Sequence, residues 1–414
     1  MTIFSQRKSN YIVSRLEHAA SGIVVVCAIF APGSAQAGTR AWINTSLNVE
    51  IATNPYLELG GKTSVSSGIV SVQPGVKYSD SINTISLTGD YRHREFSRRN
   101  RSNDDYSVNA NLVQKLSSRF GFDATVGVTS SVVTANDLLT FGVNPANGGL
   151  SPPLPGDPAF NGLQRRRQAL VGSAGFNYLA DSRNNVQIRG GFSMVRFPSG
   201  GTAAEYDNAN GSFGYNRVLN SRTSVGLNVS VTRSNYLGTL IGDATTISPQ
   251  VTFNTKFGPN WSLSASLGVS HSRVNEFFGK LGRDSAAGSV NLCNNASRGS
   301  FCLFGSRSVQ PSSLGLTVRP QTSVGASYNM RLDSKNTIDV NANFSRSGQG
   351  SLGNIVTGST SDYGHASLTY SRSFSQRLQC FMTAGYSDSF NDPVPRKANS
   401  SLNLGISYAF GDKG

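Results

Sequence analysis

The sequence predicts an all-β fold, namely a single transmembrane antiparallel β-barrel of about 16 strands. Three observations predict it. Apolar and polar residues alternate with a period of two along most of the chain, as in strands with one apolar face. Short turn motifs alternate with longer, more variable segments. Only 14% of the 414 residues are charged, whereas soluble domains average about 25%.

The composition excludes several other classes of protein. The chain has 37 Lys and Arg residues against 23 Asp and Glu, a net charge of +14, and 44 glycines. So few charges beside so much Gly, Ser, Thr and Asn fit neither a disordered charged tail nor a soluble helical protein. The longest apolar run, residues 23–31, falls short of the ~20 residues that a transmembrane helix needs. A β-rich membrane protein is the class that remains.

The first 37 residues have the pattern of a secretory signal peptide. Three basic residues precede the apolar stretch 19–31, and Ala35-Gln36-Ala37 matches a small-residue cleavage site. The alternative is a short buried helix, which does not require this order of charged, apolar and small residues. We therefore predict export, cleavage after Ala37 and a mature barrel of residues 38–414.

The alternating runs follow one another as hairpins. Tight links of turn formers, such as Leu332-Asp333-Ser334-Lys335-Asn336, alternate with longer segments. The two longest segments, 133–165 and 274–315, are expected to be loops, and the five prolines of 133–165 exclude a central strand. The expected strands are 42–52, 68–79, 84–95, 105–116, 120–132, 166–179, 186–197, 206–218, 223–234, 246–257, 261–273, 316–331, 337–347, 362–372, 378–388 and 400–410.

The turns and aromatic residues favour a membrane barrel over a soluble β-sandwich. Strands of this length in even number, with short turns at one end and long loops at the other, are typical of outer-membrane barrels with periplasmic turns and extracellular loops. A closed sheet also satisfies every backbone N–H and C=O in lipid. Aromatic residues collect at the tight-turn ends, where an interfacial girdle belongs. They are Tyr78, Phe120, Tyr178, Phe257, Trp261, Tyr370, Phe374, Tyr408 and Phe410.

The last strand carries the most specific local signal. Asn403, Gly405, Tyr408 and Phe410 follow the order polar, Gly, aromatic, aromatic. This order looks like the C-terminal signal that the barrel assembly machinery of Gram-negative bacteria reads, although residues 411–414 follow it here. We predict that this machinery is a partner and that the barrel lies in the bacterial outer membrane.

Strand parity predicts which charged residues face the lumen. The acids assigned to the lumen include Asp90, Asp123 and Asp339. A polar lumen with a modest positive bias would favour anions. The alternative is that these groups are solvated or paired in a filled barrel through which no solute passes. The basic residues assigned to the lumen are Lys77, Arg92, Arg94, Lys115, Arg165, Arg167 and Arg189.

The basic run Arg165-Arg166-Arg167 closes the long segment 133–165. A barrel of this size leaves an aqueous lumen, which a loop folded inward can narrow. One interpretation is therefore an anion-attracting constriction. The others are a basic rim on a solvent-exposed loop, or a site for lipopolysaccharide phosphates.

Cysteine and histidine patterns give no sign of catalysis. Cys293 and Cys302 lie close together and can form a disulfide in an oxidising compartment, which leaves Cys380 as an odd thiol. The histidines of the mature chain lack metal-ligand spacing, and no G-x-S-x-G motif occurs. Ser270 and His271 are adjacent on a strand, so their side chains point to opposite faces. We expect no catalytic residues, no metal and no cofactor, and export excludes a nucleic-acid partner.

Three segments resemble outer-membrane barrels of alphaproteobacteria. They are Asn54-Pro55-Tyr56-Leu57, Arg94-Glu95-Phe96-Ser97-Arg98-Arg99 and Ser102-Asn103-Asp104-Asp105-Tyr106-Ser107-Val108. On these segments the chain is similar to the beta-barrel porin 2 family. The resemblance implies an outer-membrane barrel, found in some members alongside exopolysaccharide export systems, and implies no particular functional residues.

Two functions fit these observations. The first is a porin-like channel for the diffusion or export of small polar solutes, anionic solutes or carbohydrates among them. The alternative is a structural or surface-binding barrel with a closed lumen, an accessory of exopolysaccharide secretion. Outer-membrane lipid and lipopolysaccharide are expected partners in either case, polysaccharide export components are a further candidate, and the oligomeric state is left open.

Overall fold

The computed structural model describes twelve stretches of the chain that together form its β-structure. They are residues 38–57, 64–97, 102–132, 166–198, 205–237, 242–276, 279–312, 317–348, 350–352, 355–357, 360–390 and 396–411. The predicted signal peptide with Ala35 and Ala37, the segment 133–165 and Arg165 lie outside the described residues. Within the described stretches, no helix has the length and apolar character needed to cross a membrane.

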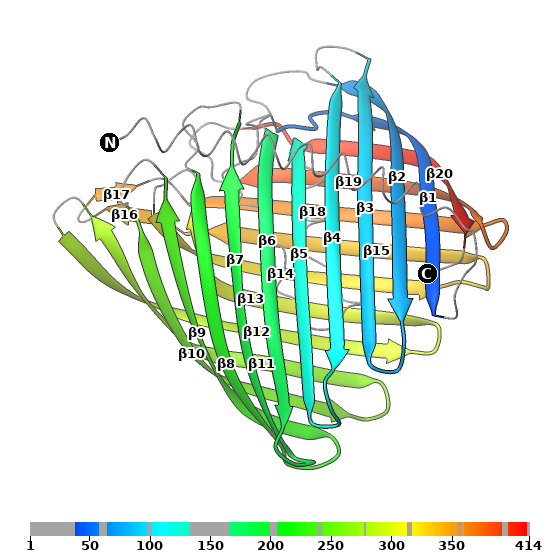
Figure 1. Cartoon of the computed structure of the whole chain (residues 1–414). Coiled ribbons are helices and arrows are strands. Elements are labelled where there is room, and N and C mark those ends of the chain that lie inside the picture. Colours follow the sequence, from blue (N-terminus) through cyan, green and yellow to red (C-terminus); the bar gives the residue numbers. More distant parts are fainter. Residues whose placement is uncertain are drawn as a thin grey trace.

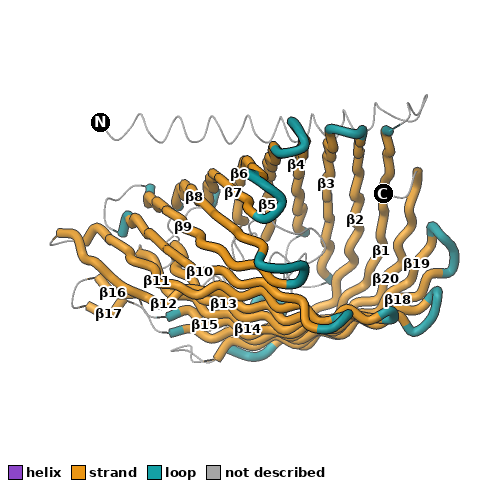
Figure 2. The backbone as a smooth tube through the Cα atoms, turned by 90° about the horizontal axis from the view of Figure 1, so that it is seen from below, coloured by secondary structure: helices purple, strands orange, loops and turns teal. Residues whose placement is uncertain are grey.

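Eighteen strands form one antiparallel sheet that closes on itself, because β1 pairs with both β2 and β20 (Figures 1 and 2). The remaining two strands, β16 (Gly350–Leu352) and β17 (Ile355–Thr357), pair only with each other. The barrel strands are β1 (Thr39–Ala52), β2 (Val65–Ser79), β3 (Asn83–Phe96), β4 (Asn103–Lys115), β5 (Phe120–Val132), β6 (Arg166–Leu179), β7 (Asn184–Arg196), β8 (Tyr206–Val218), β9 (Thr223–Tyr236), β10 (Ala244–Phe257), β11 (Trp261–Glu276), β12 (Gly279–Ala296), β13 (Gly299–Ser312), β14 (Thr317–Arg331), β15 (Asn336–Ser347), β18 (Ser361–Ser373), β19 (Leu378–Phe390) and β20 (Asn399–Gly411).

The predicted fold class is confirmed, with two more barrel strands than the approximate count from the sequence. The additional strands, β12 and β13, occupy the segment 274–315 that was expected to be a loop. Their outer-face positions include Gly288, Asp284 and Arg307, so the apolar half of the alternation is faint there. Backbone hydrogen bonds to β11 and β14 hold these two segments in the sheet, although their side-chain pattern does not predict strands.

The outer face of the barrel is apolar and exposed. Leu227, Val251 and Leu267 are register partners across β9, β10 and β11, and each is more than half exposed. Leu47 on β1 is 62% exposed. Such a surface is stable only against lipid. A closed barrel with an apolar outer face and a polar lumen is the architecture of bacterial outer-membrane proteins, and the chain is therefore an outer-membrane β-barrel.

Three of the tight turns share the sequence Asp-Ser-x-Asn, beginning at Asp80, Asp181 and Asp333. In each turn the Asp Oδ1 accepts hydrogen bonds of 2.6–2.8 Å from the backbone N–H groups two and three residues later. The Asn side chain donates to the other carboxylate oxygen. Asn220 caps the β8–β9 turn in the same way. The side-chain oxygens thus accept hydrogen bonds from backbone N–H groups of the turn that would otherwise lack an acceptor.

The turn carboxylates are held in their charged form. Backbone hydrogen bonds from Asn83 and Ile82 lower the pKa of Asp80 to about 2. The pKa values of Asp181 and Asp333 are lowered chiefly by the side chain of the motif's Asn. Because these hydrogen bonds favour the ionised form, the charged carboxylates stabilise the three turns more than the protonated ones do.

Candidate functional site: the barrel lumen

The cross-strand register places more cations than acids on the lumen face of the described strands. Six of the predicted basic residues share this face, and Arg165 lies outside the described residues. The six are Lys77, Arg92, Arg94, Lys115, Arg167 and Arg189. The same face carries Arg40, Lys256, Arg283, Arg319 and Arg331, and the acids Glu50, Asp90, Asp105, Asp123 and Asp339.

Several of these lumen cations were missed by the sequence reasoning. The alternation along the expected strands 246–257 and 316–331 would have assigned Lys256, Arg319 and Arg331 to the lumen face. Arg283 carries no such signal, because it lies in the segment 274–315 that was expected to be a loop.

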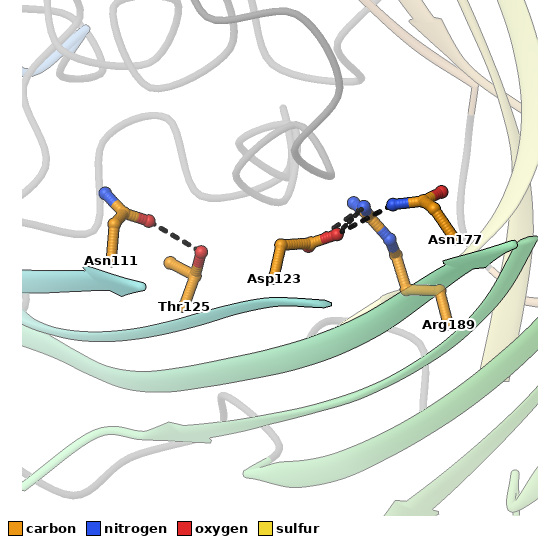
Figure 3. A network of polar contacts seen from close by, with 5 residues as sticks. All are labelled: Asn111, Asp123, Thr125, Asn177 and Arg189. Atoms are coloured by element: carbon orange, nitrogen blue, oxygen red, sulfur yellow. Dashed lines mark hydrogen bonds and ion pairs between the residues drawn. The ribbon is translucent and has the colours of Figure 1, made fainter. Parts of the chain in front are cut away.

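An ion pair crosses three strands of the lumen wall. Asp123, Gly175 and Arg189 are register partners on β5, β6 and β7, and Arg189 Nη2 lies 3.0 Å from both carboxylate oxygens of Asp123. Asn177 also donates to Asp123 Oδ1 at 3.5 Å, and all three polar side chains project from the wall (Figure 3). A Cβ at Gly175 would lie 2.9 Å from Asp123 Oδ1 and 3.1 Å from Arg189 Nε. The absence of a side chain at Gly175 therefore lets the two charges meet and cancel.

A second ion pair is buried near the loop end of the barrel. Arg94 Nη2 lies 3.7 Å from Glu50 Oε2, and the two side chains are only 6% and 5% exposed. The Arg94 guanidinium also lies 5.9 Å from the ring centre of Phe96, and Phe96 is 5.9 Å from Tyr56. The cationic lumen residue Arg94 is thus neutralised inside packed side chains and does not face open water.

The chain between β1 and β2 packs against the lumen face at this end. The backbone N–H of Asn54 donates to Asn399 Oδ1 at 3.0 Å, and Arg396 donates to the carbonyl of Leu57 at 2.9 Å. Leu57 is fully buried and has a left-handed backbone with φ of 49°. A non-glycine residue pays about 1 kcal/mol or more for this conformation, so its packing must hold it there.

Apolar clusters accompany this packing along the loop end. One contains Tyr56, Val65, Phe96 and Val132, a second contains Ala169, Val195, Phe197, Tyr206 and Tyr236, and a third contains Ala244, Val274 and Val318. These residues lie at the loop ends of their strands or in the adjoining loops. The wall of the barrel therefore carries buried apolar packing at three places near the loop end.

The turn-end half of the lumen contains a cavity of about 680 Å³ on the wall formed by β7 to β12. Asn185 near the start of β7, Asn254 near the end of β10 and Ser264 near the start of β11 place it close to the tight turns. Seven lining residues are Asn or Gln and five are Ser or Thr, whereas Arg189 is the charged one. The cavity offers hydrogen-bond donors and acceptors, and its one cation is paired with Asp123.

The C-terminal strand places the four residues of the predicted assembly signal on two faces. Asn403 and Gly405 face the lumen, whereas Tyr408 and Phe410 lie on the outer face with ring centres 4.5 Å apart. A Cβ at Gly405 would meet the ring of Phe381 on β19. This end of the barrel thus combines a tightly packed inner position with an aromatic pair at the level of the membrane surface.

The cysteines and histidines occupy separate places on the wall. A disulfide joins Cys293 and Cys302, which are register partners on β12 and β13, and Cys380 is a free thiol on β19. Ser270 is buried on the lumen face, whereas His271 contacts Asp284 on the outer face at 2.7 Å. Across the described stretches, no three His, Cys, Asp or Glu residues are grouped to hold a metal ion.

Comparisons with known proteins find similar solved structures and no match to a family model or a curated sequence. The chain is similar to Pseudomonas aeruginosa OccK2 (OpdF) in complex with glucuronate, with 11% identity, 90% of this chain and 98% of that chain covered, and a TM-score of 0.46. Pseudomonas aeruginosa OpdK has 10% identity and a TM-score of 0.46, and the match covers 90% of this chain and 99% of that chain. The FrpB iron transporter from Neisseria meningitidis (F5-1 variant) has 8% identity and a TM-score of 0.44, and the match covers 90% of this chain and 82% of that chain.

Proposed function

We propose that the protein is a porin-like channel through which small polar solutes cross the outer membrane. The observation that carries this proposal is the polar cavity of the turn-end lumen, lined by amides and hydroxyls. Barrels of 16–18 strands enclose an aqueous channel when loops or side chains do not fill it. A closed wall without backbone edges makes the lumen the route for a polar solute.

The charge on the wall gives this channel a preference for small anions. Lumen cations outnumber lumen acids, and the paired Arg94 and Arg189 contribute little to the excess. The remaining excess includes Lys77, Lys115 and Lys256 near the turn end. A field of this sign raises the local concentration of anions in a low-salt solution.

The segments that resemble the beta-barrel porin 2 family support membership of that family. The Asn54–Leu57 segment forms the buried packing between β1 and β20, and Arg94 and Phe96 of the second segment contact it or its neighbours. Asn103 of the third segment donates to the Tyr56 hydroxyl at 2.9 Å. Residues of the three segments thus contact one another at one place in the fold, near the loop ends of β1, β3 and β4.

The buried packing at the loop end favours the second candidate, a barrel with a closed lumen that acts in exopolysaccharide secretion or surface binding. The pair Arg94–Glu50 and Leu57 are buried there, whereas the wall of a wide water-filled channel would leave such residues exposed. In this alternative, lipopolysaccharide and export components bind outside the lumen, and no solute passes.

A planar-bilayer recording of the purified, refolded protein separates the two candidates. Stable unitary conductance, with a reversal potential in a KCl gradient that shows preference for chloride, is the result expected of the channel. A folded barrel that gives no conductance supports the closed-lumen alternative. The double variant Arg165→Ala/Arg167→Ala tests the constriction, because unchanged ion selectivity means that these residues do not line the path.

A further inference from the structure

The geometry points to a binding subsite for a neutral polyhydroxylated solute, such as a mono- or disaccharide, in the cavity on β7 to β12. This inference rests on the proposed channel function, because it names the class of solute that the lumen binds. The volume of about 680 Å³ lies in the range of small-molecule pockets, about 300–1,000 Å³.

The hydrogen-bonding groups of the cavity match a polyol. Each Asn or Gln amide offers both a donor and an acceptor, as each sugar hydroxyl does. Asn228 and Gln250 are register partners on β9 and β10, and both line the cavity. Asn185 and Asn216 are register partners on β7 and β8, and the Oδ1 atom of each is buried without a hydrogen-bond partner among the described residues. This wall therefore contains neighbouring amides whose oxygens do not accept a hydrogen bond from the described residues. Rotation of either amide side chain would let a solute hydroxyl donate to its oxygen.

The charge of the cavity favours a neutral solute over an anion. Arg189 is the charged lining residue, and both carboxylate oxygens of Asp123 lie 3.0 Å from its Nη2. The pair is mostly buried, at 14% and 17% side-chain exposure, so an anion in the cavity does not meet a free cation. An anion would also lose its hydration without gaining a new ion pair. The cationic excess elsewhere in the lumen attracts small ions, whereas the cavity itself selects by hydrogen bonds.

An aromatic ring on β13 lies beyond the β12 edge of the cavity and does not line it. Phe304 is the register partner of Asn291, which lines the cavity, and its side chain is half-buried on the lumen face. A Cβ at Gly325 on β14 would meet the Phe304 ring, so the ring extends along the wall over the glycine. The ring is therefore directed toward β14, and the subsite consists of the amides and hydroxyls of β7 to β12.

Binding of maltose to the detergent-solubilised, full-length mature barrel tests this subsite by calorimetry. We expect saturable binding that weakens about tenfold in Asn228→Ala/Gln250→Ala, which removes two hydrogen-bonding amides. The matched control is Asn111→Ala, because Asn111 is a lumen amide on β4 that accepts from Thr125 at 2.6 Å and does not line the cavity (Figure 3). A difference in mobility between unheated and heated samples on denaturing gels verifies folding, and Asn254→Ala replaces the double variant if the latter does not fold.

Two comparison solutes decide between the chemistry of the subsite and simple filling of space. Maltobionate has a disaccharide skeleton with a carboxylate, and polyethylene glycol of equal hydrodynamic radius has ether oxygens without hydroxyl donors along its chain. Tighter binding of maltobionate than of maltose, equal binding of polyethylene glycol, or absence of maltose binding overturns the inference. So does a cavity variant that binds as the wild type does.

The bilayer recording keeps this result separate from the channel proposal. Conductance without maltose binding overturns the subsite and leaves the channel. Maltose binding without conductance supports the subsite and overturns the channel, because the lumen then binds a sugar that does not pass.

Discussion

Replacing Asp123 by Asn removes the carboxylate that neutralises Arg189 on the lumen wall. The substitution nearly conserves side-chain volume, and Asn keeps an oxygen that can accept from the Arg189 guanidinium, which lies 3.0 Å from both carboxylate oxygens in the native pair. The change therefore uncovers one positive charge beside the cavity while disturbing its shape little.

The size of the effect follows from Coulomb's law. An ion that passes about 7 Å from an unneutralised charge in water interacts with it by about 0.6 kcal/mol, which is close to RT. Such an energy raises the local concentration of anions about 2.7-fold and lowers that of cations by about the same factor, so their ratio changes about five- to sevenfold when screening is weak, as at ~10 mM salt. We therefore expect Asp123→Asn to raise the chloride-to-potassium permeability ratio about fivefold.

Reversal potentials in a low-salt KCl gradient measure this ratio for the purified channel. Arg189→Gln leaves the Asp123 carboxylate without its partner and is expected to shift the ratio by a similar factor toward potassium. The double variant Asp123→Asn/Arg189→Gln is expected to return it close to the wild-type value. If both single variants conduct with wild-type selectivity, or shift it in the same direction, the reasoning from a neutralised pair is refuted.

Three further predictions concern other parts of the wall. Gly175→Leu inserts a side chain between Asp123 and Arg189, and we expect it to break their ion pair and to lower the free energy of unfolding by about 1–3 kcal/mol in a urea titration; an unchanged midpoint contradicts this. Cys293→Ser/Cys302→Ser removes the link between β12 and β13 and is expected to lower the free energy of unfolding by about 2–3 kcal/mol, measured by urea titration; an unchanged midpoint in the oxidised protein argues against a stabilising disulfide. The third change replaces the turn aspartates of all three Asp-Ser-x-Asn motifs by Asn, the residue that caps the β8–β9 turn. Because folding lowers their pKa values, their contribution is complete above the usual value of 3.8 and is lost as the pH falls below it, so the triple variant should lose less stability than the wild type when the pH is lowered through this range. Equal acid sensitivity in urea titrations of the two proteins contradicts this assignment.

The local pattern of the sequence determined the class of fold and the faces of most strands. Alternation such as Leu402, Leu404 and Ile406 against Asn403 and Gly405 marks the lipid and lumen sides, because successive strand residues point to opposite faces. The same alternation was too weak in β12 and β13 to predict them, since their outer positions include Gly288, Asp284 and Arg307. There the pairing of backbone groups with neighbouring strands decides the structure.

The candidate site depended on the tertiary structure. Strand parity predicted that Arg189 and Asp123 share the lumen, and it left open whether such charges attract anions or are paired with one another. Their pairing across Gly175 depends on the register of three strands, and register is a property of the closed barrel. Likewise Asn228 and Gln250 are two scattered amides in the sequence. They become neighbours in one cavity because β9 and β10 pair at that level, and the closure of the wall by β1 and β20 determines which residues enclose the lumen.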